Sequence, residues 1–165
     1  MDQAILTTML ALITAVIVAF WNSLLSRKTE LNKELRLAVA EFSKNLAIGN
    51  HAMSWLTWKA KNTPDLLTTD DIQRYEEVIN SMFTSLVAAR IIVAALNKKI
   101  HENMSTLVQR MYAMDENIAR AGALFRRSPE DGREKLASYF SEVSALEQEL
   151  LDTVTELIGT ERARQ

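Results

Sequence analysis

The most constraining feature of the chain is a run without charged side chains from Gln3 to Ser26. This run covers about 24 residues, which are mostly apolar, and a helix of that length crosses a hydrocarbon core of roughly 30 Å. A cleaved signal peptide would need a basic start, a shorter apolar stretch and a small-residue cleavage site. No Lys or Arg precedes the run, and Phe20 and Trp21 stand near its end. We therefore expect residues 1–26 to form an uncleaved transmembrane anchor.

Basic residues follow this run, whereas none precedes it. The asymmetry predicts a span with the N-terminus outside and residues 27–165 on the cytoplasmic side, because loops rich in Lys and Arg stay in the cytoplasm. The basic residues that follow are Arg27, Lys28, Lys33, Arg36 and Lys44.

Small residues also repeat within the span at every fourth position and therefore share one helix face. They are Thr7, Ala11, Ala15, Ala19 and Ser23. Small faces let helices approach closely in lipid, so this ladder favours a homo-oligomer formed through the span. The alternative is that Ala and Thr are simply common in spans.

A second apolar stretch, Ile79–Leu96, raises the question of a second span. It contains Arg90 and several hydroxyl and amide side chains, and a central Arg costs about 2.5–3.5 kcal/mol on insertion. These costs nearly cancel the free energy gained by inserting the apolar side chains into a membrane, so we expect a helix of a soluble bundle here.

The composition predicts an all-α class for the rest of the chain. Cysteine is absent, and four Gly and two Pro leave little material for a turn-rich β protein. The formal net charge of −2 argues against a nucleic-acid partner. About 135 residues suffice for one modest core, so we expect one domain besides the anchor.

Apolar residues recur with helical period in four segments beyond the anchor. Stop and start signals separate them: Asn62–Pro64, Thr68 or Thr69 as an N-cap, and Ser128–Pro129. The predicted core positions are Leu35, Val39, Phe42, Leu46, Gly49, Met53, Leu56 and Ala60; Ile72, Tyr75, Ile79, Met82, Leu86, Ala89, Val93, Leu96 and Ile100; Met104, Leu107, Met111, Met114, Ile118, Ala121 and Phe125; and Leu136, Phe140, Val143, Leu146, Leu150, Val154 and Leu157.

The segment Asn97–Ser105 contains no strong helix breaker. An unbroken helix from Asp70 to Arg126 would be about 85 Å long, against about 50 Å for its neighbours. A turn near Lys98–Asn103 gives helices of comparable length. We therefore predict a transmembrane helix that continues into an antiparallel four-helix bundle, with three long helices as the alternative.

No catalytic, metal or cofactor motif is present. His51 and His101 lack the spacings that bring metal ligands together in a helical bundle. The chain also lacks a glycine-rich phosphate loop and a nucleophile elbow. We therefore predict no cofactor, no metal and no enzymatic activity.

Three residues stand out as a candidate partner site. Trp55 and Trp58 lie three apart on one helix face, and they either cap the bundle end or contact a partner. Arg90 lies in the most apolar part of the domain, where a charge needs a partner. Either it forms a structural ion pair or snorkels to water, or it recognises an anionic ligand or an acidic partner helix.

The four-helix layout also predicts a belt of basic residues near the lipid headgroups. Since the second helix would return toward the membrane, Lys98 and Lys99 would join Arg27 and Lys28 there, together with Arg162 and Arg164. The alternative is that these are ordinary solvated residues at helix ends.

The uncharged span Ala4–Leu25, the basic segment Arg27–Arg36 and the bundle start at Leu35, Val39 and Phe42 together resemble a group of bacterial membrane proteins. These are functionally uncharacterised single-pass proteins with a cytoplasmic helical bundle. The resemblance implies this architecture and the bacterial inner membrane, and no activity.

Three functions fit these features. The first is a membrane-tethered, non-enzymatic scaffolding or regulatory module with an unknown protein partner, which the large patterned domain favours. The second is a membrane-active effector, holin-like or growth-arresting, which the small-residue ladder favours. The third is an enzyme whose site carries no recognisable motif.

Overall fold

The structure, a computed structural model, describes residues 3–162, with side chains for residues 18, 19, 22–153 and 155. Within this range every element is a helix, as predicted. The elements in chain order are α1 (Gln3–Asn62), the short 3₁₀ helix η1 (Pro64–Leu66), α2 (Thr69–Leu96), α3 (Lys98–Phe125), α4 (Pro129–Ser138) and α5 (Phe140–Arg162).

The chain divides into two compact units, Met1–Leu37 and Ala38–Gln165. The first unit contains the start of α1, and its described side chains Val18, Leu24 and Leu25 are about half exposed. Most side chains of the predicted anchor lie outside the described residues. Both the anchor and its boundary at Ser26 therefore stay predictions.

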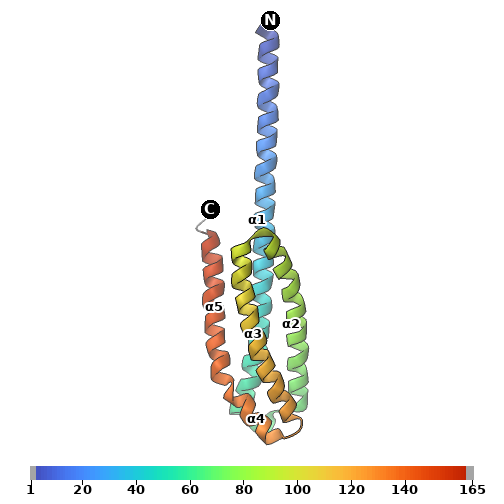
Figure 1. Ribbon diagram of the computed structural model, residues 1–165, viewed down its shortest axis with the longest axis vertical. Coiled ribbons are helices and arrows are strands. Elements are labelled where there is room, and N and C mark those ends of the chain that lie inside the picture. The colour runs from blue at the N-terminus through green and yellow to red at the C-terminus, as the bar shows by residue number, and fades with distance from the viewer. Residues whose placement is uncertain (1–2, 163–165) are drawn as a thin grey trace. The chain divides into compact units, whose positions relative to one another are not determined.

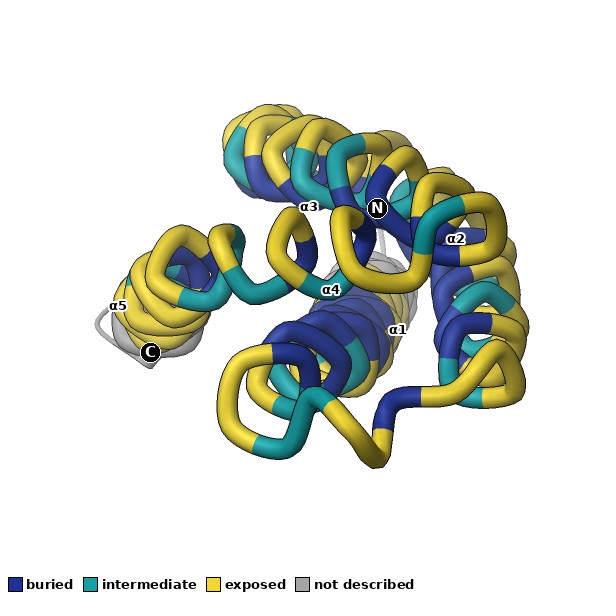
Figure 2. Tube along the Cα trace, turned by 90° about the horizontal axis from the view of Figure 1, so that it is seen from below, coloured by how far each residue is buried: buried dark blue, intermediate teal, exposed yellow. Residues whose placement is uncertain are grey.

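The second unit is a bundle in which successive helices alternate in direction (Figure 1). The part of α1 from Ala38 onward and α3 run in one direction, and α2 and α5 run in the opposite direction (Figure 1). Buried residues line the sides of α1, α2 and α3 that face one another, while the outer sides are exposed (Figure 2).

The core of this bundle consists of the predicted apolar positions. In α1 the residues from Val39 to Ala60 on the seam are buried, and Phe42, Met53 and Leu56 are fully inaccessible. The seams of α2 and α3 are buried likewise, except that Leu96 and Met114 are of intermediate exposure. In the last segment Leu136, Val143, Leu146 and Leu150 are buried, Phe140 is intermediate, and the side chains of Val154 and Leu157 lie outside the described residues.

The turn between the second and third helices lies at Asn97. This residue ends α2 with an extended conformation, φ −154° and ψ 101°, and its side chain accepts a hydrogen bond from the Ile100 backbone nitrogen at 3.1 Å. Asn97 is therefore the N-cap of α3. The alternative of one long helix through this segment is wrong.

The last segment differs from its prediction. We expected one helix from Pro129 to Gly159, whereas the structure divides it at Tyr139 into α4 and α5. The Tyr139 backbone nitrogen donates to the Leu136 carbonyl, three residues back, at 3.2 Å. Such a tightened turn changes the helix direction, and α4 consequently crosses the end of the bundle before α5 runs along it (Figure 2).

The start of α2 is held by a capping box and an ion pair. The Thr68 side chain accepts from the Asp71 backbone, and the Asp71 carboxylate accepts from the Thr68 backbone at 2.8 Å. Lys59 at the end of α1 donates to the same carboxylate at 2.6 Å. Burial raises the pKa of Asp71, but the hydrogen bonds from Lys59 and Thr68 outweigh it, so the pKa lies below the ordinary value.

Asp71→Asn is expected to lower the free energy of unfolding at neutral pH by about 2 kcal/mol, since it weakens a cap and an ion pair together. A lowered carboxyl pKa stabilises the folded state above the unfolded value and ceases to do so as the pH falls through the folded value. The difference in unfolding free energy between variant and parent should therefore become smaller as the pH falls below 3.8, the ordinary pKa of the carboxyl group. Urea unfolding of the full chain in detergent at several pH values measures it, and a pH-independent difference would contradict this reading.

Candidate functional site: a groove between α1 and α2

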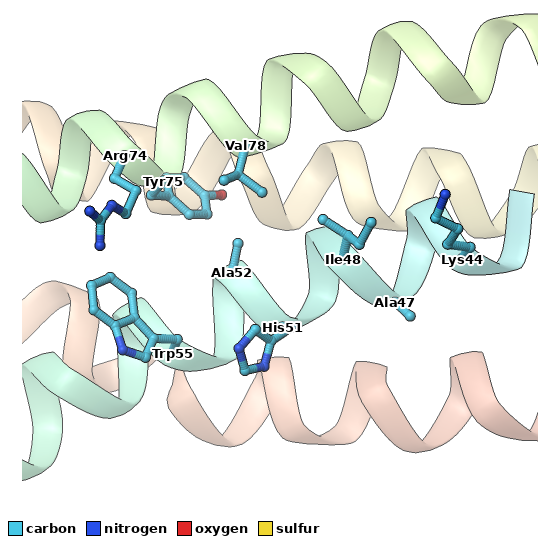
Figure 3. Close-up of a pocket in the computed structure, with 9 residues that line it drawn as sticks. All are labelled: Lys44, Ala47, Ile48, His51, Ala52, Trp55, Arg74, Tyr75 and Val78. Carbon is cyan, nitrogen blue, oxygen red and sulfur yellow. The ribbon is translucent and has the colours of Figure 1, made fainter. Parts of the chain in front are cut away.

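An open groove of about 650 Å³ lies between α1 and α2. Its apolar part comes from Ala47, Ile48 and Ala52 on α1 and from Val78 on α2. Figure 3 shows Ile48 and Val78 pointing toward each other across the groove. A volume of this size is typical of ligand-binding sites, which measure roughly 300–1,000 Å³.

Both ends of the groove carry positive charge. Lys44 lies at one end, and Arg74 lies at the other end opposite Trp55 (Figure 3). Lys44 makes only an exposed ion pair with Glu41 at 3.6 Å. Arg74 has no hydrogen-bond or ion-pair partner within the described part of the chain. None of the described lining residues is a carboxylate, so the charges of the groove complement an anion.

Tyr75 forms the floor beside Val78 and is buried. Its hydroxyl donates to the Asp115 carboxylate on α3 at 2.7 Å. Burial raises the pKa of Tyr75, and the charge of Asp115 raises it further. Burial likewise raises the pKa of Asp115, while the hydrogen bond from Tyr75 opposes this shift. The phenol therefore stays neutral and serves as a fixed aromatic floor.

Trp55 forms one wall of the groove, and its indole is contacted by Lys59. The ammonium of Lys59 lies 5.1 Å from the centre of a Trp55 ring, and the same ammonium pairs with Asp71. The cation–π contact and the ion pair together fix the indole in place. Trp55 is thus a rigid aromatic surface at the Arg74 end of the groove.

A smaller cavity of about 210 Å³ lies on the other side of α1, against α5. Asn50 and Glu147 line it, and His51 lines both this cavity and the groove. The Asn50 carbonyl oxygen is buried without a hydrogen-bond donor among the described residues. The Ser54 hydroxyl of α1 donates a long hydrogen bond to Glu147 of α5 at 3.4 Å.

The structure does not bring the three predicted partner residues together. Trp55 lines the groove, whereas Trp58, which is 45% exposed, lies elsewhere on α1 and does not line it. Arg90 lies in the second half of α2, where its guanidinium donates to the Ser105 hydroxyl at 3.1 Å. The ion pair that was one of the alternatives for Arg90 is absent from the described residues, and the Nε atom of Arg90 is buried without a partner there.

The remaining predicted residues are scattered. Lys98 and Lys99 are exposed at the turn between α2 and α3, and Arg27 and Lys28 are exposed in the first unit. Ala19 and Ser23 of the ladder are exposed, whereas the side chains of Thr7, Ala11, Ala15, Arg162 and Arg164 lie outside the described residues. His51 and His101 belong to no metal-binding cluster in the described region.

Trp55 was predicted as a candidate partner residue, whereas Ile48, Ala52, Arg74 and Val78 of the groove were not predicted. Ile48, Ala52 and Trp55 follow each other at spacings of four and three, so they form a second apolar stripe on α1 beside its buried seam. On α2, Arg74 and Val78 are four positions apart and therefore also share one helix face. This second stripe was the available signal, although nothing in it identified the facing helix.

No family model, curated protein or solved structure matches this chain. Its function must therefore be inferred from the groove, from the surfaces of the bundle and from the sequence.

Proposed function

We propose that the chain is a membrane-tethered, non-enzymatic interaction module. Its anchor is the charge-free run Gln3–Ser26, and its bundle acts at the cytoplasmic face. The groove between α1 and α2 binds an apolar segment of a partner protein that carries acidic side chains.

The lining of the groove is the observation that carries this proposal. Apolar side chains occupy its middle, while Lys44 and Arg74 stand at its ends without a carboxylate between them. Trp55 follows Lys44 by eleven positions, which corresponds to about 16 Å or three helical turns. A short amphipathic helix with acidic residues at its ends fits this length and charge.

The tether rests on the sequence. The run from Gln3 has the length and composition of a membrane span, and Arg27 and Lys28 follow it on the side that the positive-inside rule assigns to the cytoplasm. Exposed Leu24 and Leu25 in the first unit agree with a lipid environment. A tether of this kind raises the effective concentration of the bundle toward partners in the same membrane.

Photo-crosslinking in cells tests the groove. A benzoyl-phenylalanine introduced at Val78 of the full chain should give an adduct with a discrete partner. Arg74→Glu should weaken that adduct about tenfold, which corresponds to about 1.4 kcal/mol, because it replaces attraction to an acidic group by repulsion.

Arg127→Glu is the matched control, since Arg127 is also exposed and has no described ion pair. It should leave the adduct unchanged. An equal adduct from a probe at the exposed Leu151 on α5, or equal losses from both charge reversals, would reject the groove as the binding site.

A membrane-active effector is the second candidate function, and one observation favours it. Among the described residues, α2 is long and apolar enough to cross a membrane by length and composition. Together with the ladder from Thr7 to Ser23, this would give the chain two helices with an affinity for lipid. Overproduction with a membrane-potential dye separates the candidates, because only an effector depolarises the cell.

A further inference from the structure

The second half of α2 has an apolar side that nothing in the described structure covers. Its most prominent residues are Val87, Ile91 and Ile92, which are 50%, 66% and 37% exposed. Ala88, Ala94 and Ala95 are exposed around them. We call these six residues the outer face of α2. Exposed apolar patches of this kind mark binding surfaces.

The outer face carries no charge. Between Glu77 and Lys98 the single charged residue is Arg90, and its guanidinium is hydrogen-bonded to Ser105 of α3 instead of projecting from the patch. The opposite side of α2 packs in the core through Met82, Leu86 and Val93. The helix is therefore apolar on both sides, which is typical of helices surrounded by protein or lipid.

Burial by protein accounts for only part of this apolar surface. Only 28% of the most apolar stretch of α2 is buried. We expected Ile79–Leu96 to be a bundle helix, and such a helix ordinarily carries polar or charged side chains on its exposed side. The apolar side chains of α2 that the bundle leaves exposed therefore need another apolar environment.

Charge marks the end of the outer face. Lys98 and Lys99 follow it directly, and both are exposed at the turn into α3. The one described ion pair there joins Lys98 to Glu102 at 3.8 Å, with both side chains well exposed. An apolar face bordered by lysines is the arrangement by which interfacial helices bind anionic membranes.

We propose that the outer face of α2 lies in the headgroup boundary of an anionic lipid bilayer, with Lys98 and Lys99 at the lipid phosphates. Because the inner side of α2 belongs to the bundle core, α2 does not cross the membrane. This contact rests on the proposed tether, which supplies the membrane: only the segment from Arg27 to Leu37 separates the charge-free run from the bundle unit.

The absence of cysteine makes the contact measurable in the full chain. Single-cysteine variants at Ile91 and at Leu66, which is 65% exposed in η1, are labelled with an environment-sensitive fluorophore. Each is reconstituted into vesicles of equal parts phosphatidylcholine and phosphatidylglycerol that contain a nitroxide-labelled lipid. The probe at Ile91 should be quenched several-fold more strongly than the probe at Leu66. A third probe at Leu151 on α5 should behave like the one at Leu66.

A charge variant tests the lysines. Lys98→Glu combined with Lys99→Glu should reduce quenching at Ile91 in the anionic vesicles and should have little effect in vesicles of phosphatidylcholine alone. Equal losses in both kinds of vesicle would overturn the role of the lipid phosphates.

Other outcomes overturn the contact itself. If the protein floats with the vesicles but the probe at Ile91 is not quenched, the tether stands and the lipid contact is wrong. If Ile91→Cys instead forms a disulfide-linked dimer on mild oxidation without quenching, a second copy covers the face. If alkaline carbonate removes the protein from the vesicles, the tether and the contact are both wrong.

Discussion

Gly132→Ala is expected to lower the free energy of unfolding by about 3 kcal/mol, a large effect for one methyl group. Gly132 lies where α4 crosses the end of α3, and a Cβ atom there would overlap the backbone nitrogen and Cα of Phe125. Backbone atoms cannot rotate aside as a side chain can. The gain of up to about 1 kcal/mol from replacing a helical glycine does not offset this clash.

Gly49→Ala is the matched control. Its Cβ would instead meet the Met82 sulfur, which belongs to a flexible side chain and can shift. Chemical unfolding of both variants in detergent should show a loss for Gly132→Ala and a change within about 1 kcal/mol for Gly49→Ala. Equal effects at the two glycines would mean that α4 does not pack on α3 as closely as the structure shows.

Local patterns were sufficient to predict the helices and the core. The spacing of Phe42, Leu46 and Met53 fixes one buried stripe on α1 wherever the partner helices lie. Comparison of helix lengths was enough to predict a turn near Lys98–Asn103, and the structure places the turn just before this segment, at Asn97. These predictions need only helix geometry and the requirement that apolar stripes be buried.

Features that depend on the packing of particular helices escaped prediction. Nothing in the residues around Tyr139 signals a division of the last helix, and nothing signals the close crossing of α4 over α3 at Gly132. The groove requires that the Ile48–Trp55 stripe face Arg74 and Val78, and this depends on the rotation of α2. The alternatives for Arg90 were an ion pair, a snorkelling side chain or an anionic partner, and the adjacent α3 instead offers the Ser105 hydroxyl.

Methionines fill the contact between α1 and its neighbours at Gly49. A Cβ atom on Gly49 would overlap the Met82 sulfur from α2 and lie 3.1 Å from the Met111 methyl of α3. Both methionines are buried, in line with the prediction that Met111 belongs to the core. The missing side chain at position 49 therefore provides the space that these two side chains occupy.

Gly49→Leu should consequently destabilise the bundle by about 3 kcal/mol through overpacking, and Met82→Ala by a similar amount through the cavity it leaves. Because the new leucine would fill the space that Met82 vacates, the double variant should recover at least about 1 kcal/mol relative to the sum of the two losses. Met104→Ala is the control partner, since Met104 is equally buried but is not among the atoms nearest to Gly49. Its combination with Gly49→Leu should be additive in unfolding measurements. Additive losses for Gly49→Leu with Met82→Ala would show that α1 and α2 do not meet at these residues.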